Sequence, residues 1–429
     1  MTETSELVEH FFRHEYANLV SVLTRAFGIR RLDLVEEMVG AAMVQAMETW
    51  KQTGVPDNPA AWIHRVARNK TLDALRRDKI HEKAVGFSYA AQHQQDIQRE
   101  KAGPNNVIDG WLEDQSLPDS LLRMMFVCCH PILDRRSQIA LTLKLLCGFS
   151  VREVAQGLLI QPESAKKRIQ RAKKKLATDN IPIEFPETPE AQSRLAAVHD
   201  VLYLMFNEGY SPAEGSQPIR DEICEEAVRL CLLLCKHPKL ATPESKALLS
   251  LMLFHASRFE SRIDALGQIV LLEDQDRSKW NRELIKSANR WLHSSVIDQP
   301  SRFHLEAVIS AKHCEAERFE DTDWPTIVQF YDRLIELFPS PVYQLNAAIA
   351  VAQTGNFQDA KTRLQDVRQN GNLKDYFLLE CAEAYVYEKS CEPEQATDHY
   401  LAALRKPISD HQKLLIQQRL SKISNSGKH

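Results

Sequence analysis

The sequence of 429 residues lacks the hydrophobic segments that a membrane protein needs. No run of about eighteen apolar residues occurs, so we expect no membrane span and no membrane partner. The first residues carry neither a basic start nor an apolar stretch, so we expect no secretory signal. The nine cysteines are scattered without the spacing of a disulfide framework. We therefore expect a reduced, cytoplasmic protein in which cysteines such as Cys128 and Cys129 pack in the core.

The motifs of common enzyme classes are missing as well. No glycine-rich phosphate loop with its lysine and serine or threonine occurs, so nucleotide hydrolysis has no support. No serine or cysteine lies in a nucleophile-elbow motif. We predict that the protein is not an enzyme, and we expect neither a metal site nor a cofactor.

Charge is distributed unevenly along the chain. The formal net charge is −4, yet basic residues crowd Arg65–Lys79 and Lys166–Lys175 while the C-terminal half carries many acids. A whole-chain isoelectric point hides such patches, and local basic patches are where nucleic acid can bind.

The spacing of apolar residues is helical almost throughout and predicts an all-α fold. Leu7–Phe27 and Leu34–Trp50 each place apolar side chains on one helix face. The turn-rich loop Thr53–Pro59 separates them from a third helix, expected from Ala60 to about Lys79. No segment shows convincing strand alternation.

Changes in composition divide the chain. The stretch after the third helix is rich in glutamine, alanine and glycine, and three prolines stiffen a later connector. The predicted division is an N-terminal helical domain (1–83), a flexible linker (84–108), a second helical domain (109–177), a proline-rich connector (178–190) and a helical-repeat domain (191–425).

A helix-turn-helix is predicted within the second domain. Ser150 and Glu153 have the spacing of a capping box at the start of one helix. Pro162 suits the first position of a second helix, which should reach about Leu176. Two short helices joined by a tight turn make such a motif.

The second of these helices has one apolar and one polar face. Ala165, Ile169, Ala172 and Leu176 fall together on a helical wheel and should face the core. Arginine, lysine and glutamine can pair with base edges or phosphates in the major groove. A solvated basic face is the simpler alternative. The candidate DNA-binding residues of this helix are Glu163, Ser164, Lys166, Lys167, Gln170, Arg171 and Lys174.

The helix from Ala60 is a second candidate for contact with DNA. Trp62, Val66 and Ala67 can pack inward while polar side chains project outward. The alternative is an ordinary basic helix in which Asp73 pairs with Arg77. The candidates here are Asn58, Arg65, Arg68, Asn69, Lys70, Asp73, Arg76 and Arg77.

A weak internal repeat occurs near the C-terminus. Similar residues recur at a spacing of 36, as in Ala348 and Ala384, Ala360 and Ala396, and Leu364 and Tyr400. The pattern resembles tetratricopeptide repeats, in which small residues let paired helices approach.

Two further segments have local signals. Asn207–Gly215 is either a helix C-cap at Gly209 followed by a turn, or a contact loop. Asp323 should be the N-cap of a helix that follows it.

Several segments in order resemble one known family. The chain is similar to the sigma-70 superfamily of RNA polymerase sigma factors. It resembles the extracytoplasmic-function type with regions two and four, in the subgroup with a long C-terminal extension. The segments that carry this resemblance are Asp33–Glu37, Ala61–Asn69, Asp73 with Arg76 and Arg77, Cys128–Pro131, Ala140–Leu146, Ser150–Leu176 and Leu204–Tyr210.

The resemblance implies two partners, core RNA polymerase and promoter DNA. Leu34–Trp50 would dock on the clamp helices of the polymerase, with Asp33, Glu36 and Glu37 as contacts, and region four would meet the flap. The helix from Ala60 and the preceding loop would recognise and melt the −10 element. Ser150–Leu176 would bind the −35 element, and the linker would thread toward the active centre. One departure is Gly40-Ala41, where relatives carry glutamine and an acid.

Together these features predict a sigma factor whose C-terminal helical repeats bind a protein partner and regulate it. One alternative is a helix-turn-helix regulator with a helical-repeat sensor domain. Another is a scaffold whose repeats act while the DNA-binding part has decayed.

Overall fold

The computed structural model describes most of the chain and confirms the all-α prediction. Its described residues contain helices and an isolated antiparallel bridge between Ile263 and Ile269. Among them, no helix has the length and apolarity needed to cross a bilayer. The described residues are 3–85, 117–158, 160–186, 190–210, 221–264, 267–370, 377–406, 408 and 410–426. Nearly all of the predicted linker 84–108 lies outside them.

The chain forms two compact units, Met1–Leu204 and Met205–His429. The predicted division into smaller domains stays a prediction. The helices of the first unit are α1 (Glu3–Phe27), η1 (Ile29–Arg31), α2 (Leu32–Thr53), α3 (Pro59–Val85), α6 (Leu117–Cys128), α7 (Arg135–Leu145), α8 (Val151–Gly157), α9 (Pro162–Thr178) and the larger part of α10 (Glu190–Tyr210).

The second unit continues from the end of α10. Its helices are α11 (Asp221–Lys236), α12 (Pro243–Ala256), η2 (Phe259–Ser261), η3 (Leu272–Asp274), η4 (Arg277–Lys279), α13 (Arg282–His293), α14 (Arg302–Glu315), α15 (Trp324–Leu337), α16 (Pro341–Gln353), α17 (Phe357–Asn370), α18 (Phe377–Lys389), α19 (Pro393–Leu404) and α20 (Asp410–Ser426).

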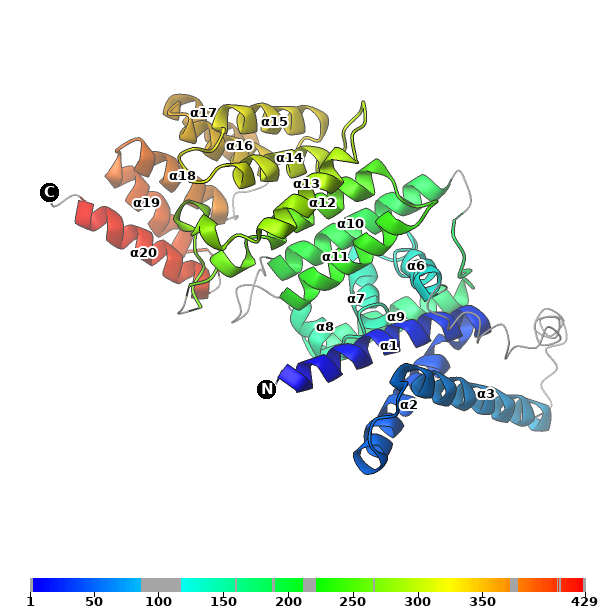
Figure 1. The fold of residues 1–429 in the computed structure, drawn as a ribbon. Helices are drawn as coiled ribbons and strands as arrows, with labels where there is room; N and C mark the ends of the chain where they lie inside the picture. Colours follow the sequence, from blue (N-terminus) through cyan, green and yellow to red (C-terminus); the bar gives the residue numbers. More distant parts are fainter. Residues whose placement is uncertain are drawn as a thin grey trace. The chain divides into compact units, whose positions relative to one another are not determined.

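Helix α1 is central to the first unit. It contacts α2 and α3 on one side and α6 and α7 on the other (Figure 1). Leu19, Val20 and Leu23 are fully buried along it, as the predicted apolar face requires. Cys128 and Cys129 at the end of α6 are also buried, as expected.

The 36-residue repeat of the second unit is confirmed. Helices α18 and α19 begin 36 residues after α16 and α17. All six residues that carry the spacing are buried. The two turns match too, because Gly355 between α16 and α17 has φ +84° and Cys391 between α18 and α19 has φ +62°.

Helix ends follow local signals in one case and not in another. Asp323 accepts a hydrogen bond from the Thr326 amide (3.2 Å), which confirms it as the N-cap of α15.

The C-cap expected at Gly209 is wrong, since α10 runs through to Tyr210. Arg258 donates to the Tyr210 hydroxyl (2.7 Å) and Arg262 to the Tyr210 carbonyl (2.7 Å), so tertiary contacts hold this last turn. Residues 211–215 of the predicted contact loop lie outside the described residues.

The matched turns lead to a stability prediction. Cys391 has a left-handed backbone conformation, which disfavours residues with a Cβ atom. Gly355, which has no Cβ atom, occupies the same place in the preceding helix pair. Cys391→Gly should therefore raise the free energy of unfolding by about 1 kcal/mol. Gly355→Ala is the reciprocal control and should lower it by about as much, since no atom outside the turn meets its new methyl group. Chemical denaturation measures both, and a destabilised Cys391→Gly variant would contradict this account.

Candidate nucleic-acid interface

The structure confirms the two helices of the predicted motif and their start signals. The Ser150 amide donates to the Glu153 carboxylate (2.7 Å), and the Glu153 amide donates to the Ser150 hydroxyl (3.2 Å). This reciprocal capping box starts α8. Pro162 stands at the first position of α9, where its missing N–H costs nothing.

One face of α9 fixes the helix to its domain. Ala165, Ile169, Ala172 and Leu176 are all buried, as the helical wheel predicts. Burial of a large aliphatic side chain contributes roughly 1.5–3 kcal/mol, so Ile169 and Leu176 hold α9 in a fixed orientation.

Three of the seven basic residues on α9 bind protein groups. Arg168 donates to the Asp134 carboxylate (3.3 Å), and Lys175 donates to the Ile132 carbonyl (2.6 Å). Lys173 contacts the carboxylates of Asp33 and Glu36 in α2. Arg168 and Lys173 are therefore partly neutralised by carboxylates, while Lys175 is hydrogen-bonded to a neutral carbonyl.

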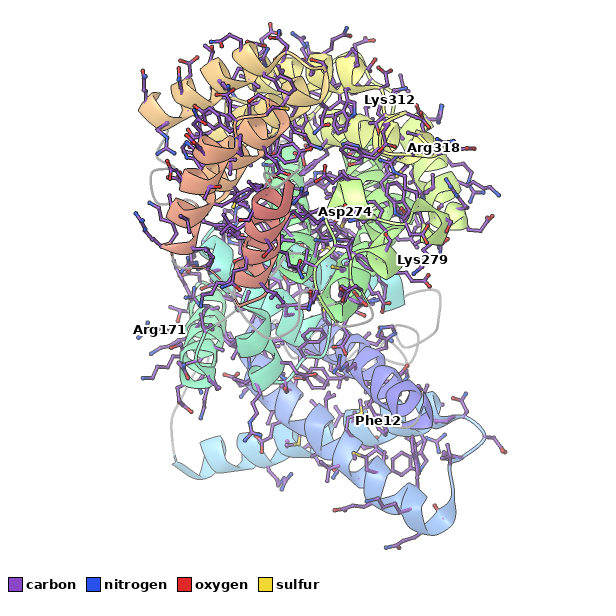
Figure 2. The ribbon with its side chains drawn as sticks, turned by 90° about the vertical axis from the view of Figure 1, so that its left-hand side faces the viewer. Phe12, Arg171, Asp274, Lys279, Lys312 and Arg318 are labelled. Carbon is purple, nitrogen blue, oxygen red and sulfur yellow. The ribbon has the colours of Figure 1, made fainter. Side chains whose placement is uncertain are left out.

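The other four basic residues point away from the protein. Lys166, Lys167, Arg171 and Lys174 are exposed and have no hydrogen-bond or ion-pair partner in the described part of the chain. Figure 2 shows Arg171 on the outer side of α9. Glu163, Ser164 and Gln170 are exposed beside them. This face can therefore donate hydrogen bonds to phosphates or base edges without breaking any contact in the protein.

Helix α3 presents a second polar face. Asn58 accepts a hydrogen bond from the Ala61 amide (3.0 Å) and so caps the start of α3. Of the other candidates, Arg68 and Lys70 are half-buried. The exposed ones are Arg65, Asn69, Asp73, Arg76 and Arg77.

The inward face of α3 is broader than the sequence indicated. Ala67 is buried as predicted, and Trp62 and Val66 are half-buried. Ile63 is fully buried and was not predicted. Trp62 packs edge-on against Trp50 of α2, with ring centroids 5.7 Å apart.

The ion pair expected between Asp73 and Arg77 is wrong. The Asp73 carboxylate lies 3.5 Å from Arg76 instead, and Arg77 donates to the Asp73 carbonyl (3.3 Å). Both partners of the pair are exposed, so it contributes little stability and leaves the arginines available.

The three candidate polymerase contacts lie in different environments. The Asp33 side chain is 83% exposed and Glu37 is exposed, but the Glu36 side chain is only 9% exposed. Glu36 accepts a hydrogen bond from the Tyr16 hydroxyl (2.6 Å) besides its contact with Lys173. Burial and the nearby Glu36 carboxylate raise the pKa of Tyr16.

Lys173 and Tyr16 were not predicted as site residues. Burial opposes the charge on Lys173, but the Glu36 and Asp33 carboxylates outweigh it and raise the Lys173 pKa. The basic run showed a cation at 173 but gave no sign that its acceptors lie 137 and 140 residues earlier in the chain.

A cluster in the second unit has the composition of a metal site. Glu380, Glu383 and His399 bring their ligand atoms within 4.8 Å of one another. Arg368 lies against both carboxylates, with its Nη2 2.9 Å from Glu380 and its Nε 2.9 Å from Glu383. The guanidinium already supplies the positive charge, so ion pairs join α17 to α18, and a hydrogen bond between His399 and Glu380 joins α19 to them.

Comparison with known proteins identifies the two domains that carry these polar surfaces. A model of sigma-70 region 2 matches residues 11–80, and a model of sigma-70, region 4 matches residues 123–176. The chain belongs to the sigma-70 family. It is a sigma factor with regions 2 and 4 and a helical C-terminal extension, and its matched domains are those of a promoter-recognition protein.

The extension of this sigma factor has relatives whose role is not known. A family of unknown function (DUF6596) matches residues 194–296. An uncharacterized protein of Rhizobium meliloti (strain 1021) is 36% identical over 394 residues, which cover 90% of each chain. No solved structure matches the chain.

The outward face of α9 leads to a DNA-binding prediction. Lys167→Ala and Arg171→Ala should each weaken binding of this sigma factor to promoter DNA, by about 1–3 kcal/mol where the residue contacts a base. A residue that contacts only phosphate should instead reduce the salt dependence of binding by about one counterion. Fluorescence anisotropy with a labelled duplex at several salt concentrations distinguishes the two.

The control for this prediction is Lys279→Ala in the second unit. Lys279 is exposed and labelled in Figure 2, and its substitution removes the same charge from a surface without the motif. Equal effects of Lys167→Ala and Lys279→Ala would show that net charge, and not the face of α9, governs binding.

Proposed function

We propose that this sigma factor binds core RNA polymerase through α2, recognises −10 and −35 elements through α3 and α9, and opens the promoter for initiation. The observation that supports this most directly is the outer face of α9. Four cations there have no partner among the residues that the structure describes, and the opposite face of the helix is fixed in the core. An exposed cluster of cations attracts anions, so a cationic face on the second helix of a helix-turn-helix suits an anionic partner such as DNA.

A continuous face of α2 suits polymerase docking. Residues spaced by three or four along a helix lie on one face, and Glu37, Val44 and Met47 follow this spacing. Val44 is 55% exposed and Met47 is 52% exposed, which is high for large apolar side chains. Apolar side chains left in solvent on a helix that carries charged neighbours indicate a protein partner.

The departure Gly40-Ala41 lies on this same face. A glycine inside a helix costs roughly 0.5–1 kcal/mol relative to alanine. A Cβ atom added at Gly40 would meet nothing within 4 Å, so packing inside the chain does not require the glycine. Gly40 and Ala41 project less far from the helix than the acidic residues before them and Val44 and Met47 after them. A partner helix can therefore approach α2 closely at this point.

Strand opening would use the exposed polar side chains of α3. Arg65, Arg76 and Arg77 can bind phosphates, while Asn69 can hydrogen-bond to an exposed base edge. The turn-rich segment before α3 precedes this face directly, and its Val55 side chain is 67% exposed. Such a loop has the composition to receive a base that leaves the stack.

The C-terminal unit would regulate initiation by binding a protein. Stacked helix pairs such as α16–α17 and α18–α19 form extended surfaces that bind proteins in other repeat folds. Truncation is best made after Leu204, because Arg135 of α7 contacts Asp200 and donates to the Ala197 carbonyl (3.1 Å). A cut at Glu190 would remove these contacts. Unchanged transcription by the Leu204 truncation would argue against regulation.

Run-off transcription tests the proposal. The purified chain is combined with bacterial core polymerase free of other sigma factors and with a library of genomic fragments. Discrete transcripts that require the chain are the expected result. Binding to DNA without any binding to core polymerase would instead support the helix-turn-helix regulator with a sensor domain.

The face of α2 leads to a specific prediction about core binding. Val44→Asp should weaken binding to core polymerase at least tenfold, which corresponds to about 1.4 kcal/mol, because it places a charge in an apolar contact. Val296→Asp is the matched control, since Val296 is an 82% exposed valine in the second unit and undergoes the same change. Binding is measured by surface plasmon resonance. Equal affinities of the two variants would exclude this face of α2 as the docking site.

A further inference from the structure

The region-two helices (α1, η1, α2 and α3) and the region-four helices (α6–α9) pack directly on each other within the first unit. Helix α1 contacts α6 and α7, and α9 contacts η1 and α2. Figure 1 shows α1 running alongside the region-four helices. These contacts join the two parts that recognise different promoter elements in the proposed function.

One contact requires a glycine. Gly148 follows α7 with φ +68°, and a Cβ atom there would lie 2.7 Å from the carbonyl oxygen of Arg13 in α1. That distance is too short for any side chain, and the nearest atoms belong to the backbone, which cannot move aside easily. The Arg13 guanidinium lies 4.9 Å above the Phe149 ring and pairs with Glu153, the capping residue of α8. The two backbones are therefore fitted closely at this point.

The other contacts are half-buried charges that find partners across this interface. Arg25 of α1 donates to Asp119 (3.0 Å) and to Ser120 (3.1 Å) at the start of α6. Lys144 of α7 lies 4.8 Å from the centre of the Tyr16 ring. Burial lowers the pKa of Lys144, in spite of the Glu36 carboxylate nearby.

Lys173 completes the interface at the end of α2. Its side chain is 12% exposed and contacts Asp33 and Glu36, while Glu36 is also bonded to Tyr16. Asp33 and Glu36 lie on the same helical face as Val44 and Met47, at its N-terminal end. The region-four helices therefore shield Glu36 at one end of the face that is proposed to dock on polymerase, while Asp33 stays largely exposed although it is paired with Lys173.

This packing is incompatible with binding both promoter elements. Elements named for positions −10 and −35 are centred about 25 base pairs apart, which is roughly 85 Å along a duplex that rises 3.4 Å per base pair. A duplex this short is much shorter than the persistence length of about 150 base pairs and does not fold back on itself. The Lys173 ammonium lies 3.0 Å from the Asp33 carboxylate, so α9 must leave α2 before each part reaches its own element.

The chain is long enough for such a separation. Helix α3 ends at Val85 and α6 begins at Leu117, so 31 residues connect them. A segment of that length spans at most about 100 Å when extended. Separation of the two parts therefore needs no unfolding of α3 or α6.

We propose that the chain has a closed state in which Lys173, held by Asp33 and Glu36, locks the region-four helices onto the region-two helices and occupies these two carboxylates of the α2 docking face. This inference rests on the proposed function, because binding of polymerase and promoter is what opens the closed state. Opening frees Asp33 and Glu36 for polymerase and lets α9 reach the −35 element. The outer face of α9 is exposed in both states.

Distance measurement by pulsed electron paramagnetic resonance on the full chain tests this. Spin labels are placed at Gln52→Cys in α2 and Thr178→Cys in α9, both exposed, in a Cys391→Ser background that removes the exposed native cysteine. Mass spectrometry confirms two labels per chain. The free protein should give one short, narrow distance, and core polymerase with promoter DNA should lengthen it.

Neighbouring lysines supply matched variants. Lys173→Glu should broaden and lengthen the distance in the free protein, and Lys173→Glu with Glu36→Lys should restore it by exchanging the charges. Lys174→Glu makes the same charge change one residue along, on a side chain without a partner in the described residues, and should keep the short distance. Circular dichroism checks that all variants keep their helices.

Three results would count against part of this account. A long, broad distance in the free protein, or equal effects of Lys173→Glu and Lys174→Glu, would overturn the lock. A distance that stays short in a complex that transcribes would overturn the need for opening. Failure to bind core polymerase, with the short distance still dependent on Lys173, would refute the proposed function and leave the lock in place.

Discussion

Electrostatic repulsion along α9 is the constraint on which the first unit depends. Seven cations lie between Ala165 and Lys175, and Arg171 has four of the others (Lys167, Arg168, Lys174 and Lys175) at spacings of three or four, where like charges destabilise a helix. The structure relieves this repulsion on one side of the helix only. Arg168, Lys173 and Lys175 each receive a protein acceptor, and the remaining four stay in solvent. The division gives one helix two tasks, since the paired cations hold it in the protein and the unpaired ones attract an anion.

Local features of the first unit could be predicted because their signals are local. The capping box at Ser150, the proline at position 162 and the buried stripe from Ala165 to Leu176 all depend on spacings of three or four residues. The sequence alone indicates such spacings. The outward direction of Lys167 and Arg171 follows from the same helical period, whereas their binding to DNA stays a prediction.

Contacts between distant parts of the chain could not be predicted. Nothing near Lys173 distinguishes it from Lys174, although one is buried against α2 and the other is exposed. Gly148 has the left-handed conformation of an ordinary turn glycine, yet it is also needed for the approach of Arg13. Tertiary contacts also overrode the local signal for a C-cap at Gly209, because stacking of Tyr210 on Phe206 and its bonds to two arginines hold α10 past the glycine.

The second unit combines a predicted repeat with ion pairs that the repeat did not indicate. Buried small residues set the spacing of α16–α19, and this was visible as a period of 36. The link from Arg368 to Glu380 and Glu383 was not visible in the sequence, because charged residues vary between the helix pairs while the small residues recur. Tyr400 shows how the array ends, since it packs against Ile416 of α20, a helix that belongs to neither pair.

A repeat of constant length has a consequence for how such a protein changes over time. Each helix pair contacts mainly the neighbouring pairs, so a whole pair can be gained or lost without refolding the others. The matching turns at Gly355 and Cys391 mark where such an event would join in register. An extension built in this way can alter the length of its binding surface in steps of one helix pair, while the promoter-recognition helices stay as they are.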